Sequence, residues 1–125
     1  MKALRQALQT FWSQLGLPVR AAGQLTPGTK MPCIVWDMAP AGLPDVLDVT
    51  ATCWFRENHG ACADMLSRMR ALLPEGGLLL RFPGGMAVCF RGASERAEDR
   101  QDARLCGATL HMEVHLYAEE ELDEC

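Results

Sequence analysis

Residues 47–73 read LDVTATCWFRENHGACADMLSRMRALL, and this stretch decides the fold because its hydrophobic period changes partway along. From Leu47 to Phe55 apolar side chains alternate with mostly polar ones, which is typical of a half-buried β-strand. Asn58 then offers an N-cap side chain, and apolar residues recur at helical spacing from Ala61 to Leu73. The stretch predicts a long strand followed directly by an amphipathic helix.

The residues before this stretch predict a first helix and two further strands. Apolar side chains three and four positions apart predict a helix from Lys2 to Leu15. We expect a short strand at Val19–Ala22, a turn-rich loop at 24–30, and a second strand at Cys33–Met38.

The residues after the stretch predict a hairpin and a final strand. Leu78–Phe82 and Met86–Arg91 flank a Pro-Gly-Gly turn and read as the two hairpin strands. The strongly polar segment Gly92–Arg104 reads as a solvated loop or a short helix. Leu105–Tyr117 alternates again and reads as the last strand.

These elements predict an α+β domain with two layers, a mostly antiparallel β-sheet packed against two α-helices. We expect one domain over residues 1–118 and an acidic tail over 119–125, without a repeat or an internal linker. The apolar runs are only a few residues long, so neither a membrane span nor a signal peptide is expected.

Charge and cysteine usage exclude several classes of partner. The net charge is -4, but five acidic residues lie in the last seven positions, so the rest of the chain is near +1. A near-neutral body argues against duplex binding through a broad basic face. The six cysteines contain no C-x-x-C pair and are expected as buried apolar residues in a reducing compartment.

The pattern His111-x-Glu113-x-His115 is the most suggestive arrangement for an enzyme. It places three potential ligands on one strand face at intervals of roughly 7 Å, too wide to close easily around one ion. No nucleophile motif or phosphate-binding loop occurs. We therefore expect no catalytic residue, no metal and no cofactor, and keep a small metal-dependent hydrolase using these three residues as an alternative.

Arg96, Arg100 and Arg104 are four positions apart and would share one face if their segment were helical, with acids interleaved. A soluble surface loop and an ordered contact segment both fit this pattern.

The whole succession resembles the tail terminator and tail-completion proteins of long-tailed bacteriophages and prophages. The likeness is carried by the N-terminal helix, the strand around Pro32-Cys33-Ile34-Val35-Trp36, the strand from Asp48 to Phe55 with its following helix, and the ending His111–Tyr117. It covers nearly the whole chain and rests on the order of elements and on length.

The resemblance implies a structural protein of the virion tail, assembled in the cytoplasm of the bacterial host, and not an enzyme. Such proteins form a ring, commonly a homohexamer, that caps the tail tube and serves head-tail joining. Its implied partners are copies of itself, the major tail tube protein and the head-tail connector protein. No membrane and no specific nucleic acid is implied, although DNA passes through the ring lumen.

Under this reading a set of polar residues is expected at subunit or tube contacts or facing the lumen. The set is Arg91, Arg96, Arg100, Arg104, Thr109, His111 and Glu113. Replacing Arg100 and Arg104 by Glu is expected to weaken ring or tube assembly without unfolding the monomer. A head-tail connector (neck) protein and a small regulatory binding domain remain alternatives to the terminator.

Overall fold

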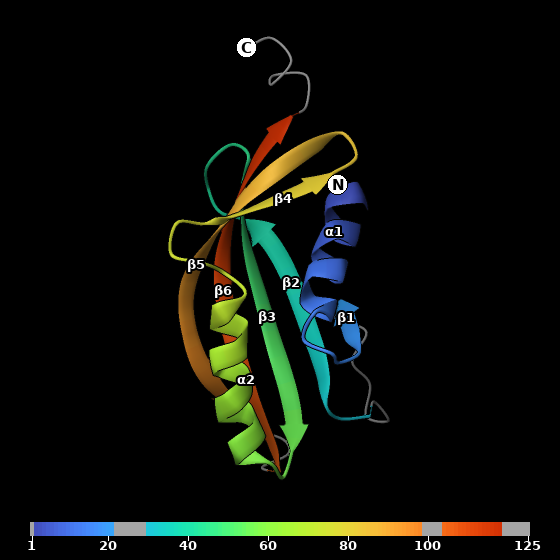
Figure 1. The fold of residues 1–125 in the computed structure, drawn as a ribbon, viewed down its shortest axis with the longest axis vertical. Coiled ribbons are helices and arrows are strands. Elements are labelled where there is room, and N and C mark those ends of the chain that lie inside the picture. The colour runs from blue at the N-terminus through green and yellow to red at the C-terminus, as the bar shows by residue number, and fades with distance from the viewer. Residues whose placement is uncertain (1, 22–29, 99–103, 119–125) are drawn as a thin grey trace.

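The computed structural model describes residues 2–21, 30–98 and 104–118 (Figure 1). The elements are α1 (Lys2–Ser13), β1 (Val19–Ala21), β2 (Cys33–Pro40), β3 (Val46–Arg56), α2 (His59–Ala71), β4 (Leu78–Phe82), β5 (Gly85–Glu98) and β6 (Leu105–Ala118). The predicted order of helix, strands, helix and strands is confirmed. Most of the predicted loop at 24–30, Arg100 and the acidic tail lie outside the described residues.

All six strands form one sheet in the order β1-β2-β3-β6-β5-β4. β1 runs parallel to β2, and every other neighbouring pair is antiparallel. The expected α+β class is confirmed, and most strand pairs are antiparallel as expected. The expected two-layer arrangement is wrong in one respect, because the sheet is mixed and curled and is not a simple antiparallel layer.

The curl brings the two edges of the sheet to the same helix. α1 contacts both β1 and β4, although these strands lie at opposite ends of the strand order. α2 packs against β6, β5 and β3 on the same face (Figure 1). Sheets twist with a fixed hand, and long strands such as β5 and β6 accumulate that twist into a curl around α1.

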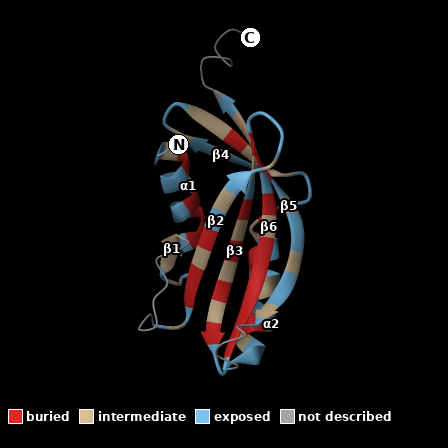
Figure 2. Cartoon of the chain, turned by 180° about the vertical axis from the view of Figure 1, so that it is seen from behind, coloured by how far each residue is buried: buried red, intermediate tan, exposed pale blue. Residues whose placement is uncertain are grey.

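The core lies between the helices and this face of the sheet. Leu4, Leu8 and Trp12 of α1 are at most 1% exposed, and Met69 of α2 is fully buried. From the sheet, the core takes mainly the residues Ile34, Trp36, Val49, Ala51, Cys53, Cys106, Ala108, Leu110, Met112 and Val114. Buried and less buried residues alternate along β3 and part of β2, whereas residues 105–110 of β6 are all buried (Figure 2).

Asn58 begins α2 as predicted. Its side-chain Oδ1 accepts a hydrogen bond from the backbone N–H of Ala61 at 3.0 Å. This contact satisfies one of the N–H groups that a helix leaves unpaired at its start. The strand β3 therefore passes into α2 through a single capped turn.

The prediction of a loop or short helix at 92–104 is wrong for residues 92–98, which continue β5. Arg91 pairs with Met112 and Ser94 pairs with Leu110, so two residues of β5 lie opposite one residue of β6. This β-bulge adds one residue and reverses which face each later side chain takes. The polar composition of this segment suggested a loop, but its backbone pairs with β6, and this pairing makes it a strand.

Candidate functional site: the open face of the sheet

Neither helix of the described residues covers the face of the sheet opposite α1 and α2, and we call it the open face (Figure 2). Strand registers place on it the side chains of Val35, Asp37, Asp48, Thr50, Thr52, Trp54, Val88, Phe90, Glu95, Thr109, His111, Glu113, His115 and Tyr117. The expectation that Thr109, His111 and Glu113 share one face of the last strand is confirmed. The open face is less solvated than expected, because Thr109 is only 6% exposed.

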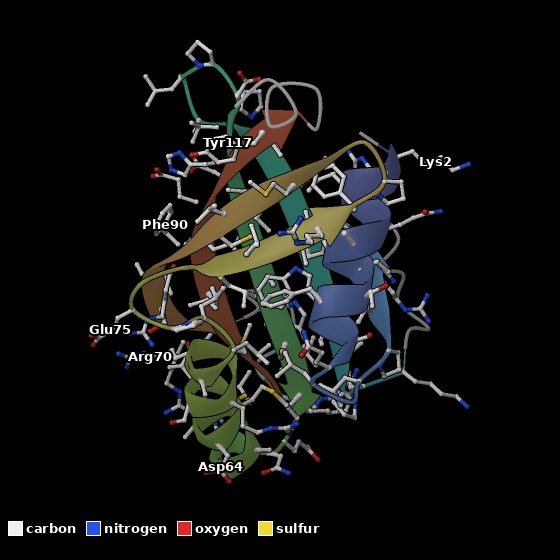
Figure 3. The ribbon with its side chains drawn as sticks, turned by 45° about the horizontal axis from the view of Figure 1, so that its top comes forward. Lys2, Asp64, Arg70, Glu75, Phe90 and Tyr117 are labelled. Carbon is white, nitrogen blue, oxygen red and sulfur yellow. The ribbon has the colours of Figure 1, made fainter. Side chains whose placement is uncertain are left out.

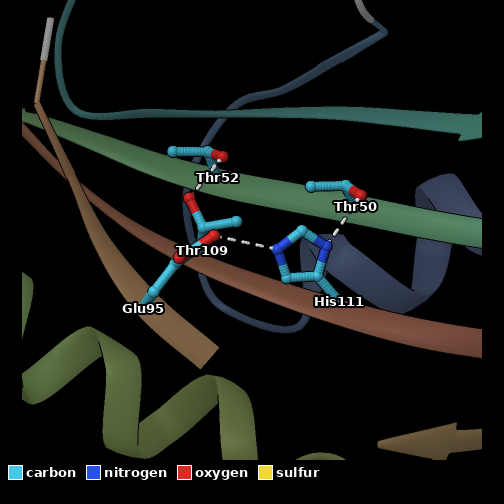
Figure 4. Close-up of polar contacts among 5 residues, drawn as sticks. All are labelled: Thr50, Thr52, Glu95, Thr109 and His111. Carbon is cyan, nitrogen blue, oxygen red and sulfur yellow. Dashed lines mark hydrogen bonds and ion pairs between the residues drawn. The ribbon is translucent and has the colours of Figure 1, made fainter. Parts of the chain in front are cut away.

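A threonine pair lies at the centre of the open face. Thr52 and Thr109 are direct neighbours across β3 and β6, and their hydroxyl oxygens are 2.8 Å apart (Figure 4). Beside them Gly107 is a position where a Cβ would lie 2.9 Å from the Thr52 methyl group. This close approach lets the Thr52 and Trp54 side chains of β3 lie over the backbone of β6 at Gly107.

His111 joins three strands next to this pair. Its Nδ1 lies 3.2 Å from the Thr50 hydroxyl on β3, and its Nε2 lies 3.1 Å from Glu95 Oε1 on β5 (Figure 4). The β-bulge delivers the Glu95 carboxylate, because without the extra residue Glu95 would point to the helices. Gly92 allows the bulge to sit close, since a Cβ there would be 3.0 Å from the backbone oxygen of His111.

A second histidine and carboxylate lie further along β6. His115 Nε2 is 2.6 Å from Glu113 Oε1, and the His115 ring meets Phe90 edge-on at 5.2 Å between centroids. Asp48 is the direct neighbour of Glu113 across the β3–β6 pair. Two exposed carboxylates therefore face each other, and neither forms an ion pair with a lysine or arginine among the described residues.

The upper end of the open face is apolar. Leu79, Phe90 and Tyr117 are 46%, 38% and 42% exposed and belong to three neighbouring strands, with Leu79 on this face as the direct neighbour of Val88. Phe90 and Tyr117 are labelled in Figure 3. Phe90 lies against Gly77, which has a φ of 95° and whose Cβ would come within 2.9 Å of the ring. Large exposed apolar side chains on adjacent strands are typical of a surface that binds another protein.

The lower end carries a shallow hollow of about 280 Å³ between β2 and β3. Trp54 and Val35 give it apolar walls, while Asp37, Asp48 and Thr50 give it polar ones. The open face thus has Trp54 in the hollow at one end and the exposed rings of Phe90 and Tyr117 at the other.

The structure places two of the predicted arginines, Arg91 and Arg96, on the helix side of the sheet. Arg91 Nη1 donates to the carbonyl of Arg70 at 3.1 Å, near the end of α2, where helix carbonyls lack partners. Arg96 Nη2 donates to the carbonyl of His59 at 3.4 Å, at the start of α2. Arg104 is exposed just before β6, and Arg100 lies outside the described residues.

The predicted set therefore does not form one surface. Arg91 and Arg96 hold the two ends of α2, whereas Thr109, His111 and Glu113 lie on the open face. Sequence reasoning missed Thr50 and Glu95 as the partners of His111. Gly92 inside an alternating pattern was the available signal, because a glycine within a strand often marks a β-bulge.

Within residues 2–21, 30–98 and 104–118, no three His, Cys, Asp or Glu side chains are grouped so that they could hold a metal ion. His111 and His115 each contact a carboxylate, but the two carboxylates belong to different strands. The face offers hydrogen-bond donors and acceptors together with apolar contact area, which is a composition suited to binding.

The five described cysteines are free and buried. Burial raises the pKa of the Cys53 thiol to about 12 and that of the Cys89 thiol to about 11. Both side chains therefore stay protonated at neutral pH and pack as small apolar groups, as expected from their scatter along the sequence.

No protein-family model matches the sequence, and no curated protein is significantly similar to it. Neither α1 nor α2 is long and apolar enough to cross a membrane, within the part of the chain that the structure describes.

Proposed function

We propose that this protein is a subunit of a ring that caps the tail tube of a long-tailed bacteriophage. In this role, copies of the chain associate, stop the growth of the tube and offer a surface for head-tail joining. The order of elements matches the order on which the resemblance to tail terminator proteins rests. The observation that carries the proposal is the apolar end of the open face, formed by Leu79, Phe90 and Tyr117.

The charges of the chain support contact between two different surfaces of neighbouring copies. Asp48 and Glu113 oppose each other on the open face, and like charges in this arrangement destabilise an isolated sheet. α1 contains no acidic residue and exposes Lys2 and Arg5. A copy that sets its α1 against the open face of the next would place these cations near the paired carboxylates.

A contact between two different surfaces propagates from copy to copy. When the rotation between neighbours closes, the result is a ring, and the family that the chain resembles commonly uses six copies. Within such a ring, the predicted contact residues that do not bond an end of α2 are Arg104, which is exposed, and the open-face residues Thr109, His111 and Glu113.

The oligomeric state and the effect on tail tubes test the proposal together. Size-exclusion chromatography with light scattering is expected to give a closed oligomer, and added protein is expected to cap tail tubes and limit their length in electron micrographs. A protein that stays monomeric at every concentration and leaves the tube length distribution unchanged would overturn the proposal.

Charge reversal tests the two surfaces. The variant Asp48→Arg with Glu113→Arg keeps a like-charge pair within the sheet but reverses its sign toward a neighbour, and Lys2→Glu with Arg5→Glu reverses α1. Each double variant is expected to weaken association by about 100-fold, since like-charge juxtaposition at an interface costs several kcal/mol. The variant that combines all four changes is expected to regain it.

Ser67→Glu is the matched control, because it adds charge on exposed α2, away from both surfaces. Circular dichroism spectra are expected to be the same for all variants. If rings form but the reversals have no effect, or the fourfold variant stays dissociated, the pairing of α1 with the open face is wrong while the ring itself stands.

A further inference from the structure

Two buried cysteines lie against each other where α2 meets β6. The sulfur atoms of Cys62 and Cys106 are 2.7 Å apart, and the two residues are 0% and 3% exposed. A disulfide bond has a length of about 2.05 Å, so these atoms need to approach by only about 0.7 Å more. Of the other described thiols, Cys53 lies near Met69 and Cys33 near Met31, and a thioether cannot form a disulfide.

We propose that Cys62 and Cys106 are a redox-responsive pair that a small-molecule disulfide, such as oxidised glutathione, converts into a bond between α2 and β6. The Cys62 thiolate attacks one sulfur of glutathione disulfide and releases one glutathione thiolate. The Cys106 thiolate then attacks the Cys62 sulfur of this mixed disulfide and releases the second. The protein loses two protons and two electrons in total, and these reduce glutathione disulfide to two glutathione molecules.

The start of α2 gives the reagent its route to Cys62. Cys62 lies in the first turn of the helix, after the exposed residues His59 and Gly60. Glycine destabilises a helix relative to alanine, and helix ends open locally at low free-energy cost. Opening of this one turn exposes the Cys62 thiol without unfolding the sheet.

The closed state protects the pair. Burial raises the pKa of the Cys62 thiol to about 12, and the hydrogen bond with Cys106 is the second largest cause of this rise. Because the thiolate is the reacting form, the closed protein does not react, and the rate follows the opening of the first turn of α2. The pair therefore stays reduced where glutathione is reduced and oxidises slowly where it is not.

The bond would join positions 44 residues apart and so enclose most of α2 together with β4 and β5. Cross-links that close long loops stabilise mainly by restricting the unfolded chain. The chemistry of the pair does not depend on ring formation. In a virion it would distinguish the reducing cytoplasm of assembly from the oxidising exterior.

Peptide mapping of the oxidised protein tests the proposal. Cys125→Ser is introduced in all samples, so that the five remaining cysteines are those that the structure describes. Native protein is incubated with oxidised glutathione, alkylated and digested with trypsin without reduction. Peptides 57–68 and 105–125 are expected to be joined, and the thermal midpoint is expected to rise by roughly 5 °C or more.

Single substitutions separate this pair from the other thiols. The variant Cys89→Ala is expected to form the bond between Cys62 and Cys106 as the parent does, because Cys89 takes no part in that bond. Cys62→Ser and Cys106→Ser are expected to give no joined peptides. If either fails to fold, the map of the parent protein still decides.

Three results would overturn the proposal. The first is a parent protein in which all thiols stay free, although hydrogen exchange shows that the first turn of α2 has opened many times during the incubation. The second is separate glutathione adducts on Cys62 and Cys106, and the third is a bond from either cysteine to Cys53.

Discussion

The hydroxyl pair Thr52–Thr109 makes a quantitative prediction about the centre of the open face. Thr109 is 6% exposed, and its one described side-chain partner is the Thr52 hydroxyl at 2.8 Å. Thr52→Val leaves the Thr109 hydroxyl buried without that partner, which costs about 1–3 kcal/mol. Thr109→Val leaves the Thr52 hydroxyl, which is half-buried and can reach water, so the cost is about 1 kcal/mol.

The double variant is expected to be nearly as stable as the parent. Replacing both partners by apolar groups of the same shape is close to neutral, and valine suits a strand. Because the double variant loses almost nothing, the coupling in the double-mutant cycle equals the sum of the two single costs, about 2–4 kcal/mol. With a urea slope of about 2 kcal/mol/M, a loss of about 1.5 kcal/mol lowers the unfolding midpoint by about 0.75 M.

Urea unfolding of the four proteins, followed by circular dichroism, measures this coupling. Thr50→Val is the control, because its partner His111 has a side chain that is 43% exposed and can bond water, so its cost should stay within about 0.5 kcal/mol. Costs of Thr52→Val and Thr109→Val that simply add in the double variant would refute the reasoning.

Three further predictions concern the helix start, a close backbone contact and alkaline pH. Asn58→Ala removes the side-chain acceptor of an α2 N–H and should lower the free energy of unfolding by about 1 kcal/mol in urea, whereas Asn58→Asp should retain most of it. Gly107→Ala places a Cβ 2.9 Å from a threonine methyl group and should cost about 1–3 kcal/mol, whereas Gly60→Ala, whose nearest neighbour is 3.9 Å away, should be neutral or stabilising in the same assay. Since the folded chain holds the Cys53 and Cys89 protons that an unfolded chain releases near pH 9.0, stability should be full below that pH and fall as pH rises toward 11–12, more weakly in Cys89→Ala. Urea midpoints at pH 8 and pH 10 that are equal would contradict this last expectation.

The elements with strong periodicity could be predicted from the sequence. Alternation from Leu47 to Phe55 and the cap at Asn58 depend on neighbours in the chain, and β3 and α2 have the predicted types and nearly the predicted limits. The direction of β1 and the curl of the sheet depend on pairing between distant segments. No local pattern records these features.

The candidate site also has a part that the sequence predicts and a part that depends on pairing between distant segments. The alternation of β6 placed Thr109, His111 and Glu113 on one face, because it is a property of the strand itself. Glu95 was missed because its position depends on a register shift, and the charged composition of its segment resembled a loop. The burial of Thr109 and its contact with Thr52 could not be predicted either, since the alternation within a strand does not show which residues of other strands lie beside it.

The bulge in β5 also determines how this surface can be probed. Before it, the even-numbered residues Val88 and Phe90 point away from the helices, and after it the odd-numbered residue Glu95 does. Spectroscopic labels at positions 88 and 95 would therefore report on one environment, and labels at 91 and 96 on another. A natural variant lacking a single residue between these pairs would exchange the sides of its acidic and basic groups while its composition stayed almost unchanged.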